Sequence, residues 1–204
     1  IKLAKLNHEI HSLYFTDGVS SRNYKKNLEK KIIERRKYAQ AASKIIGIKK
    51  CKFFSYPDNK LDTVPFLEIV KNIEIEISRI KPEIIFTHYE NDLNIDHQII
   101  NRAVVTATRP KPKNQIKQIL LFETLSSTEW KFSQKNQQFN PNFHVDISKT
   151  ITKKVKAASC YKEEIFSWPH PRSKKGIKNL AMIRGQNVGL KYAEAFYLLR
   201  KVIN

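Results

Sequence analysis

The sequence predicts an α/β fold with a largely parallel sheet flanked by helices. Short runs rich in β-branched and aromatic residues alternate with longer runs whose apolar residues recur at helical spacing. Such alternation is typical of parallel strands, because a helix between two strands returns the chain to the same end of the sheet. The expected strands are residues 9–16, 51–56, 83–88, 118–124 and 143–147.

The first two long helical patterns are bounded by residues that start or stop helices. Residues 23–46 form a long basic stretch that ends at Gly47, a residue favoured just after the last helical turn. Residues 64–80 carry Pro65 in the first turn and end before Pro82, where a further helical residue is disfavoured. We therefore expect two helices with these bounds.

A third pattern, residues 96–108, places its apolar side chains on one face and ends before Pro110. It predicts an amphipathic helix directly after the strand at 83–88. Further helices are expected at residues 148–161, 175–185 and 192–202.

The start of the chain differs from the rest. Residues 1–6 have the composition of the end of a helix, and a strand follows almost at once. We therefore expect the first strand of the sheet to be missing from residues 1–204. Because the sequence shows no repeat, low-complexity tract or linker, residues 1–204 are expected to form a single domain.

Composition narrows the functional classes. Apolar residues make up 41% of the 204 residues, and no run approaches the ~18 apolar residues of a membrane span. Two cysteines without a Cys-x-x-Cys spacing provide neither a disulfide framework nor a thiolate zinc site, and they favour a cytoplasmic protein.

The net charge of +19 raises the possibility of a nucleic-acid or polyanion partner. However, the lysines are spread along the chain, and the sequence contains no helix-turn-helix, zinc-finger or RNA-recognition signature. We therefore expect no nucleic-acid partner and regard the charge as a compositional bias with a solvated helix face.

Polar side chains follow each of the first four expected strands. Ligands of open α/β sheets bind beyond the carboxyl ends of the strands, so a site is expected in these loops. The loops are residues 16–18, 57–59, 88–97 and 123–129.

The most concentrated polar stretch is NDLNIDHQ, residues 91–98. A helix N-cap explains one residue of this stretch, either Asn94 or Asp96. It does not explain His97 beside an aspartate, with Asp92 and His88 just upstream. Imidazole is the commonest side-chain metal ligand and the commonest acid–base group, so the pattern alone leaves both roles open.

Seven blocks of the sequence occur in an order that resembles the PIG-L/LmbE-like N-deacetylase family nearly end to end. This resemblance implies a Rossmann-like sheet and a zinc ion, or another divalent cation, that activates water to remove the acetyl group of an N-acetylglucosamine-type conjugate. The blocks are LYFTDGVSSR, RRKYAQAASKIIGI, YPDNKLD, FTHYENDLNIDHQ, ETLSSTEW, HPRS and RGQNVGLKYAEAF.

The resemblance also implies roles for individual residues. His97 matches a zinc ligand, and Asp96 matches the aspartate that supports the residue assisting the tetrahedral intermediate. Arg35 matches an arginine that grips the substrate. Asn94 stands where some members carry a catalytic histidine, so the general acid is left open and Asn94 is expected to contact substrate.

Three further residues are expected near the substrate. His170 and Arg172 match the family's His-Pro-Arg-Ser block and would meet sugar hydroxyls or a phosphate, with an ordinary polar loop as the alternative. His88 would line the pocket, with a buried structural histidine as the alternative.

The family's Ala-His-Pro-Asp-Asp loop, which supplies two zinc ligands and the general base, does not occur in residues 1–204. It would precede Ile1, as the expected missing strand would. His97 alone is too few ligands for catalytic zinc, which needs about three protein ligands and a water. Residues 1–204 alone are therefore expected to bind zinc weakly and to release no acetate.

The sequence thus favours a zinc-dependent N-deacetylase whose partner is an N-acetylated amino sugar. A basic polyanion-binding module and a non-catalytic member of the family are the alternatives. The pattern specifies neither the acetylated conjugate nor the oligomeric state.

Overall fold

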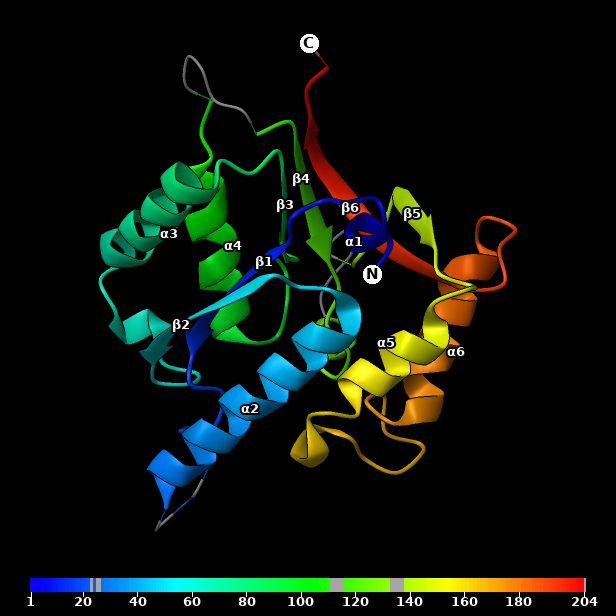
Figure 1. Ribbon diagram of the computed structural model, residues 1–204, viewed down its shortest axis with the longest axis horizontal. Helices are drawn as coiled ribbons and strands as arrows, with labels where there is room; N and C mark the ends of the chain where they lie inside the picture. The colour runs from blue at the N-terminus through cyan, green and yellow to red at the C-terminus, as the bar shows by residue number, and fades with distance from the viewer. Residues whose placement is uncertain (23, 25–26, 111–115, 133–137, 204) are drawn as a thin grey trace. The chain divides into compact units, whose positions relative to one another are not determined.

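The computed structural model of the protein describes residues 1–22, 24, 27–110, 116–132 and 138–203, and the chain forms two compact units (Figure 1). The first unit comprises Ile1–Asn59 and Asp146–Glu194, and the second comprises Lys60–Val145 and Ala195–Asn204. The single domain expected for residues 1–204 stays a prediction.

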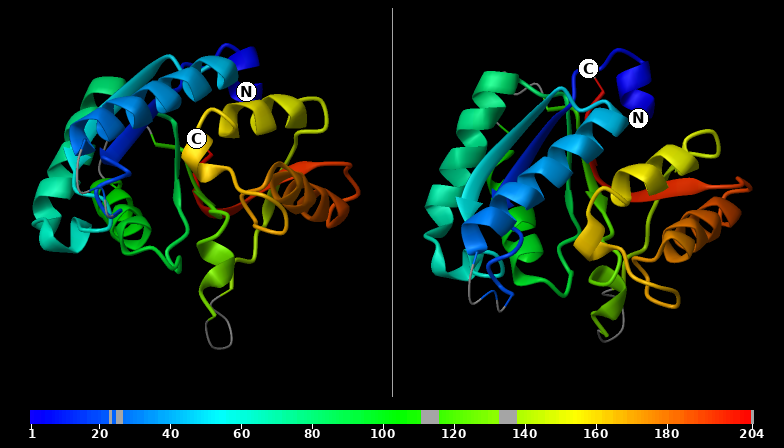
Figure 2. Two further views of the ribbon diagram at one scale, coloured as in Figure 1. Left: turned by 90° about the horizontal axis from the view of Figure 1, so that it is seen from below. Right: turned by 60° about the horizontal axis from the view of Figure 1, so that its bottom comes forward.

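The first unit contains a two-stranded parallel sheet of β1 (His11–Thr16) and β2 (Lys50–Tyr56). Side chains that face each other across the pair stack: the rings of Tyr14 and Phe53 lie 4.9 Å apart. Helix α5 packs beside α2 and α6 (Figure 2). The helices of this unit are α1 (Lys2–Lys5), α2 (Leu28–Ile46), α5 (Ile151–Ala158), the short 3₁₀ helix η3 (Lys162–Glu164) and α6 (Lys174–Gln186).

The end of α2 confirms the role predicted for Gly47. Its φ of +86° is in the left-handed region, and its N–H donates to the carbonyl oxygen of Ser43 at 2.9 Å. A β-carbon at this position would lie 2.6 Å from that of Ala4. Glycine therefore satisfies both the backbone conformation and the close approach.

The start of α2 lies five residues later than predicted. Asn27 has a φ of +69°, so the residue before Leu28 is not in a right-handed helical conformation. Part of the predicted beginning, residues 23, 25 and 26, lies outside the described residues.

Most of the second sheet belongs to the second unit. Its strand order is β3 (Ile84–His88), β4 (Gln118–Phe122), β6 (Ala193–Lys201) and β5 (Phe143–Asp146). Strands β3 and β4 are parallel, whereas β4 and β6 are antiparallel, so the sheet is mixed. The α/β class is confirmed.

The predicted helix at residues 192–202 is wrong, because this segment forms β6. Ala and Leu favour helices, but this segment pairs with β4, Leu198 opposite Leu120 and Phe196 opposite Phe122. Ala193 and Ala195 are buried at a spacing of two residues, which is the period of a strand. Tertiary pairing thus overrides local propensity.

Helices α3 (Phe66–Ile80) and α4 (Ile95–Ala107) lie side by side in the second unit (Figure 2). Pro65 is the N-cap of α3 and not part of its first turn. Lys81, with a φ of +52°, ends the helix just before Pro82, as predicted. The 3₁₀ helices η1 (Leu61–Thr63) and η2 (Thr128–Trp130) complete this unit.

The core of the second unit is built on β4. Ile119 and Leu121 are buried together with Tyr89, and Ile85 packs against them. This core fixes the ends of β3 and β4, which Asp92 and Ser127 follow in the chain. Within the described part of the chain, none of the helices is both long enough and apolar enough to span a bilayer.

Candidate functional site

The turn between β3 and α4 is held by its own polar side chains. The carboxylate of Asp92 accepts the Asn94 N–H at 2.9 Å, and the Asn94 side chain accepts the Asp96 N–H at 2.8 Å. Asn94 is therefore the N-cap of α4, one of the two candidates that the sequence offered. The cap places His97 in the first turn of the helix.

Asp92 is completely buried beneath this turn and receives hydrogen bonds from three other side chains. His97 Nδ1 lies 3.0 Å from Asp92 Oδ1, the Ser127 hydroxyl donates to the same oxygen, and the Thr128 hydroxyl donates to Oδ2 at 2.5 Å. Burial by itself raises the pKa of Asp92, but these hydrogen bonds outweigh it and lower the pKa to about 2. Asp92 is therefore a carboxylate at neutral pH.

The Asp92 carboxylate determines which nitrogen of His97 carries the proton. An ionised carboxylate can only accept hydrogen bonds, so His97 Nδ1 donates. In the neutral ring, Nε2 then keeps its lone pair. The side chain of His97 is 20% exposed. This geometry suits a metal ligand or a general base.

The ring of His88 stacks on that of His97, with centroids 4.0 Å apart and planes 11° apart. Burial, followed by the proximity of His97, lowers the pKa of His88 to about 3, so this ring is neutral at pH 7. The Asn101 side chain donates to the His88 carbonyl oxygen at 2.8 Å and holds the end of β3 against α4. His88 therefore lies directly against His97, and its predicted contact with substrate stays a prediction.

Asp96 is also buried, but its carboxylate contacts the backbone. Its Oδ1 accepts the N–H of Leu61 at 2.9 Å and ties η1 to the start of α4. The catalytic role expected for Asp96 and the substrate contact expected for Asn94 stay predictions.

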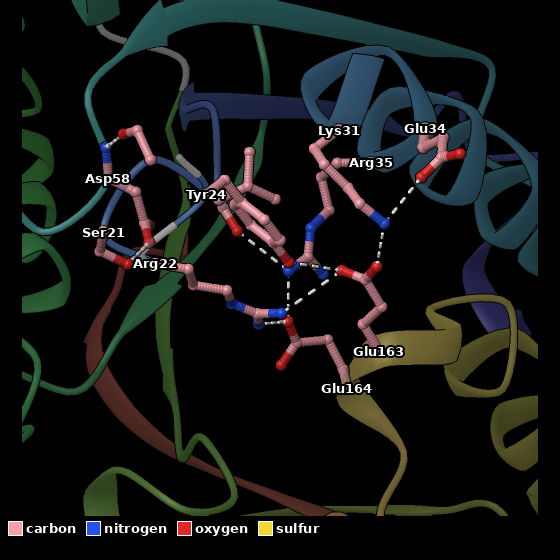
Figure 3. Close-up of polar contacts among 12 residues, drawn as sticks. Ser21, Arg22, Tyr24, Lys31, Glu34, Arg35, Asp58, Glu163 and Glu164 are labelled. Carbon is pink, nitrogen blue, oxygen red and sulfur yellow. Dashed lines mark hydrogen bonds and ion pairs between the residues drawn. The ribbon is translucent and has the colours of Figure 1, made fainter. Parts of the chain in front are cut away.

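The first unit holds a separate polar cluster around Glu164 (Figure 3). The guanidinium groups of Arg22, Arg35 and Arg172 all donate to its carboxylate. Burial raises the pKa of Glu164, but the hydrogen bond from Arg35 and the charges of the three arginines outweigh this effect and lower it. The cluster thus has an ionised carboxylate at its centre.

Arg35 connects this cluster to the loop after β1. Its terminal nitrogen also donates to the carbonyl oxygen of Gly18 at 2.9 Å, and its guanidinium lies 5.6 Å from the centre of the Tyr161 ring. The loop itself is anchored by Asp58, which accepts a hydrogen bond from the Ser21 hydroxyl (Figure 3). Arg35 is thereby held in one position.

His170 and Arg172 lie together in the loop before α6. The Arg172 N–H donates to His170 Nδ1 at 3.1 Å, and both side chains pack against Phe166. The structure therefore brings Arg172 and Arg35 to the same carboxylate, Glu164. His170 reaches the cluster through its contacts with Arg172.

Residues 1–108, about half of the chain, match the model of the family described as PIG-L, GlcNAc-PI de-N-acetylase. The chain belongs to the PIG-L family. This result confirms the resemblance that the sequence blocks indicated.

The solved structures that share this fold belong to enzymes which, by their names, catalyse more than one kind of reaction. An N,N'-diacetylchitobiose deacetylase from Pyrococcus horikoshii is 19% identical, with a TM-score of 0.76 over 98% of this chain and 76% of that chain. A 4-carboxy-2-hydroxymuconate hydratase from Pseudomonas putida is 20% identical, with a TM-score of 0.72 over 98% and 88%. The zinc-inhibited form of a teicoplanin deacetylase is 13% identical, with a TM-score of 0.74 over 100% and 92%. At these identities the likeness establishes the fold.

Among the described residues of this PIG-L family chain, His97 is suited to act as one ligand of a metal ion. His97 presents Nε2 with a lone pair, and Asp92 orients the ring from behind, as carboxylates do for metal-bound histidines. Nowhere in the described ranges do three or more His, Cys, Asp or Glu side chains gather in a way that could hold a metal ion. His97 is thus a single candidate ligand and not a complete set.

Sequence reasoning assigned no role to the two carboxylates that organise the clusters, Asp92 and Glu164. It assigned the aspartate next to His97 in sequence, Asp96, whereas the structure places Asp92 against the ring. The oxygen-rich turn was a signal for Asp92, but spacing alone could not choose between the two. No local sequence pattern points to Glu164, because two of its arginine partners are distant in the sequence. Arg22 is 142 positions away and Arg35 is 129 positions away.

Proposed function

We propose that this PIG-L family protein is a metal-dependent N-deacetylase that hydrolyses the acetamido group of an N-acetylglucosamine-type conjugate. The observation that carries the proposal is the pair of Asp92 and His97, which presents an oriented imidazole nitrogen at the carboxyl end of β3. Family membership supports the reaction class. One deacetylase among its structural neighbours acts, by its name, on an N-acetylated sugar.

In this proposal His97 supplies one ligand to Zn²⁺ or a related divalent cation. When bound, such an ion polarises the acetyl carbonyl and supplies a nucleophilic water near neutral pH. Asp92 is the positioning residue, because its buried carboxylate holds the Nδ1 proton and directs Nε2 outward. Asp96 is proposed to act on turnover from the first turn of α4.

Arg35 is proposed to bind the substrate, since a guanidinium presents several N–H donors to sugar hydroxyls or anionic groups. His170 and Arg172 are proposed to extend this contact, and His88 and Asn94 to border the reacting end of the substrate. We place the protein in the cytoplasm as part of the same proposal.

The direct test is acetate release. With a strand ending in the family's Ala-His-Pro-Asp-Asp loop joined ahead of Ile1, the protein is expected to release acetate from N,N'-diacetylchitobiose or a related N-acetylglucosamine conjugate, and to lose this activity after chelation and regain it with added Zn²⁺. Residues 1–204 alone are expected to release none. Metal-restored activity against 4-carboxy-2-hydroxymuconate with no acetate release from any acetamido sugar would contradict the proposal, because a structural neighbour of the same fold is a hydratase.

A polyanion-binding function is the alternative that the charge of +19 raises. Nucleic-acid binding of this kind weakens steeply as salt is raised, because counterions are released from the phosphates. A gel-shift titration over a salt series separates the two functions. We expect at most weak binding that is lost at physiological salt.

A further inference from the structure

Three arginines from different parts of the first unit converge on one carboxylate. Arg22 follows β1, Arg35 lies on α2, and Arg172 precedes α6. Arg22 and Arg35 share Glu164 Oε1, and Arg172 donates to Oε2. Figure 3 shows Arg22 and Arg35 directed at Glu164, while Lys31 is directed at the neighbouring Glu163.

The carboxylate of Glu164 has only two oxygens for the N–H donors of three arginines. A single guanidinium forms two parallel hydrogen bonds with a carboxylate, so one arginine suffices for one glutamate. Here two arginines share one oxygen. The Nε of Arg172 is buried and has no acceptor within hydrogen-bonding distance among the described residues. A buried N–H without an acceptor is costly, and it marks a place where another oxygen would bind.

The charge of the cluster is also unbalanced. Arg22, Arg35, Arg172 and Lys31 contribute four positive charges, and Glu34, Glu163 and Glu164 contribute three negative charges, so the net charge is +1. Without Glu164 it would be +2. Because the side chains of Arg35 and Glu164 are each only 15% exposed, water compensates this charge poorly.

A phosphate monoester matches these features better than a carboxylate does. It has three terminal oxygens, one for each guanidinium, and a charge close to −2 at neutral pH. Arginine is the side chain best suited to phosphate because its planar fork donates two hydrogen bonds at once. The exposed sides of Arg22 and Arg172, each 35% exposed, give a ligand access to the cluster.

We propose that Arg22, Arg35 and Arg172 form a binding site for a phosphate monoester, and that Glu164 occupies this site when no ligand is present. This proposal rests on the proposed function in that Arg35 and Arg172 are its proposed substrate contacts. Phosphate binding can nevertheless be measured without metal and without turnover, so the two proposals can fail separately. Its ligand is a small phosphorylated molecule or a phosphorylated lipid headgroup, which share this chemistry.

The test compares phosphate binding by calorimetry in the intact protein and two variants. Glu164→Gln removes the internal competitor, so inorganic phosphate should bind at least about fivefold more tightly than to the wild type. Arg172→Gln removes one charged donor, so binding should weaken about tenfold or more. Lys71→Gln, which removes one positive charge from an exposed ion pair with Glu74 on α3, is the control and should leave binding unchanged.

The arms of the experiment identify the source of the phosphate. Glycerol 3-phosphate represents a soluble ester, and vesicles containing phosphatidic acid, compared with phosphatidylcholine alone, represent a lipid. Arg172-dependent binding to either supports the proposal.

Three results would overturn the proposal. The first is that neither the wild type nor Glu164→Gln binds phosphate. The second is that Glu164→Gln binds it more weakly than the wild type while remaining folded. The third is that Lys71→Gln weakens binding as much as Arg172→Gln. If Glu164→Gln does not fold, as judged by circular dichroism, Arg172→Gln decides alone: unchanged phosphate binding rejects the site.

Discussion

At the scale of single residues, the proposed chemistry depends on a buried carboxylate beneath an imidazole. Asp92 accepts hydrogen bonds from His97, Ser127 and Thr128, and its pKa is about 2. This arrangement fixes the tautomer of His97 and the direction of Nε2. The remaining roles proposed at this end of β3 depend on that direction.

The first residue-scale prediction concerns Asp92→Asn. The side-chain amide keeps the shape, but its NH₂ group cannot accept from His97 Nδ1, Ser127 and Thr128 as the carboxylate does. In the protein that carries the Ala-His-Pro-Asp-Asp loop ahead of Ile1, we expect Zn²⁺ affinity to fall about 10- to 100-fold and the free energy of unfolding to fall by about 1–3 kcal/mol. Competition with a chromogenic chelator and denaturant titration measure the two effects. Asp62→Asn, at an exposed position in η1, is the control and should change neither.

The second prediction concerns the protonation of His88. Its pKa of about 3 lies below the ordinary value of 6.5, so the unfolded chain binds this proton more readily than the folded chain does. The stabilising contribution of the neutral ring is therefore fully present above pH 6.5 and is lost progressively as the pH falls toward 3. NMR of the ring carbons and nitrogens should show His88 neutral at pH 5. A titration midpoint near 6.5 would contradict this assignment.

Some of these site residues could be predicted from the sequence, and others could not. His97 could be singled out because it follows an expected strand end and has an aspartate beside it. Asp92 could not be chosen over Asp96, since the capped turn determines which carboxylate faces the ring. The convergence of Arg22, Arg35 and Arg172 on Glu164 depends on contacts between distant segments, which no local pattern specifies.

At the scale of elements, local signals predicted most helices and strands. Gly47 ends α2 and Pro82 follows the end of α3, as expected, because these residues restrict the backbone whatever surrounds them. The exception is β6, whose helix-favouring residues pair with β4. The partner strand, and not the propensity of the segment, determines that structure.

The element-scale prediction compares two glycines with left-handed backbones. Gly47 has a φ of +86° and a close neighbour in Ala4, whereas Gly189 has a φ of +71° and open space around the β-carbon position. Gly189→Ala should cost about 1 kcal/mol of unfolding free energy from backbone strain alone. Gly47→Ala should cost about 1–3 kcal/mol more because of overpacking against Ala4. Equal losses in thermal or denaturant unfolding would show that the close approach to Ala4 has no energetic consequence.

At the scale of the whole molecule, membership of the PIG-L family and the α/β fold are shown, and the two compact units each hold one polar cluster. The largely parallel sheet expected from the sequence is mixed, because β6 runs antiparallel to β4. Alternation of strands and helices predicts the class, but the direction of a strand late in the chain depends on which partner it reaches. The resemblance of seven blocks in family order identified the family, although each block alone is weak.

The central claim is that His97 binds the metal of an N-deacetylase. The most direct measurement is the metal content and acetate release of His97→Ala beside the wild type, both carrying the Ala-His-Pro-Asp-Asp loop ahead of Ile1, with folding checked by circular dichroism. The ring of His97 is 20% exposed and touches His88 and Asp92, so its removal should leave a folded protein. We predict that the variant loses bound Zn²⁺ and nearly all acetate release from N-acetylglucosamine conjugates. Wild-type zinc stoichiometry together with wild-type turnover in His97→Ala would contradict the claim.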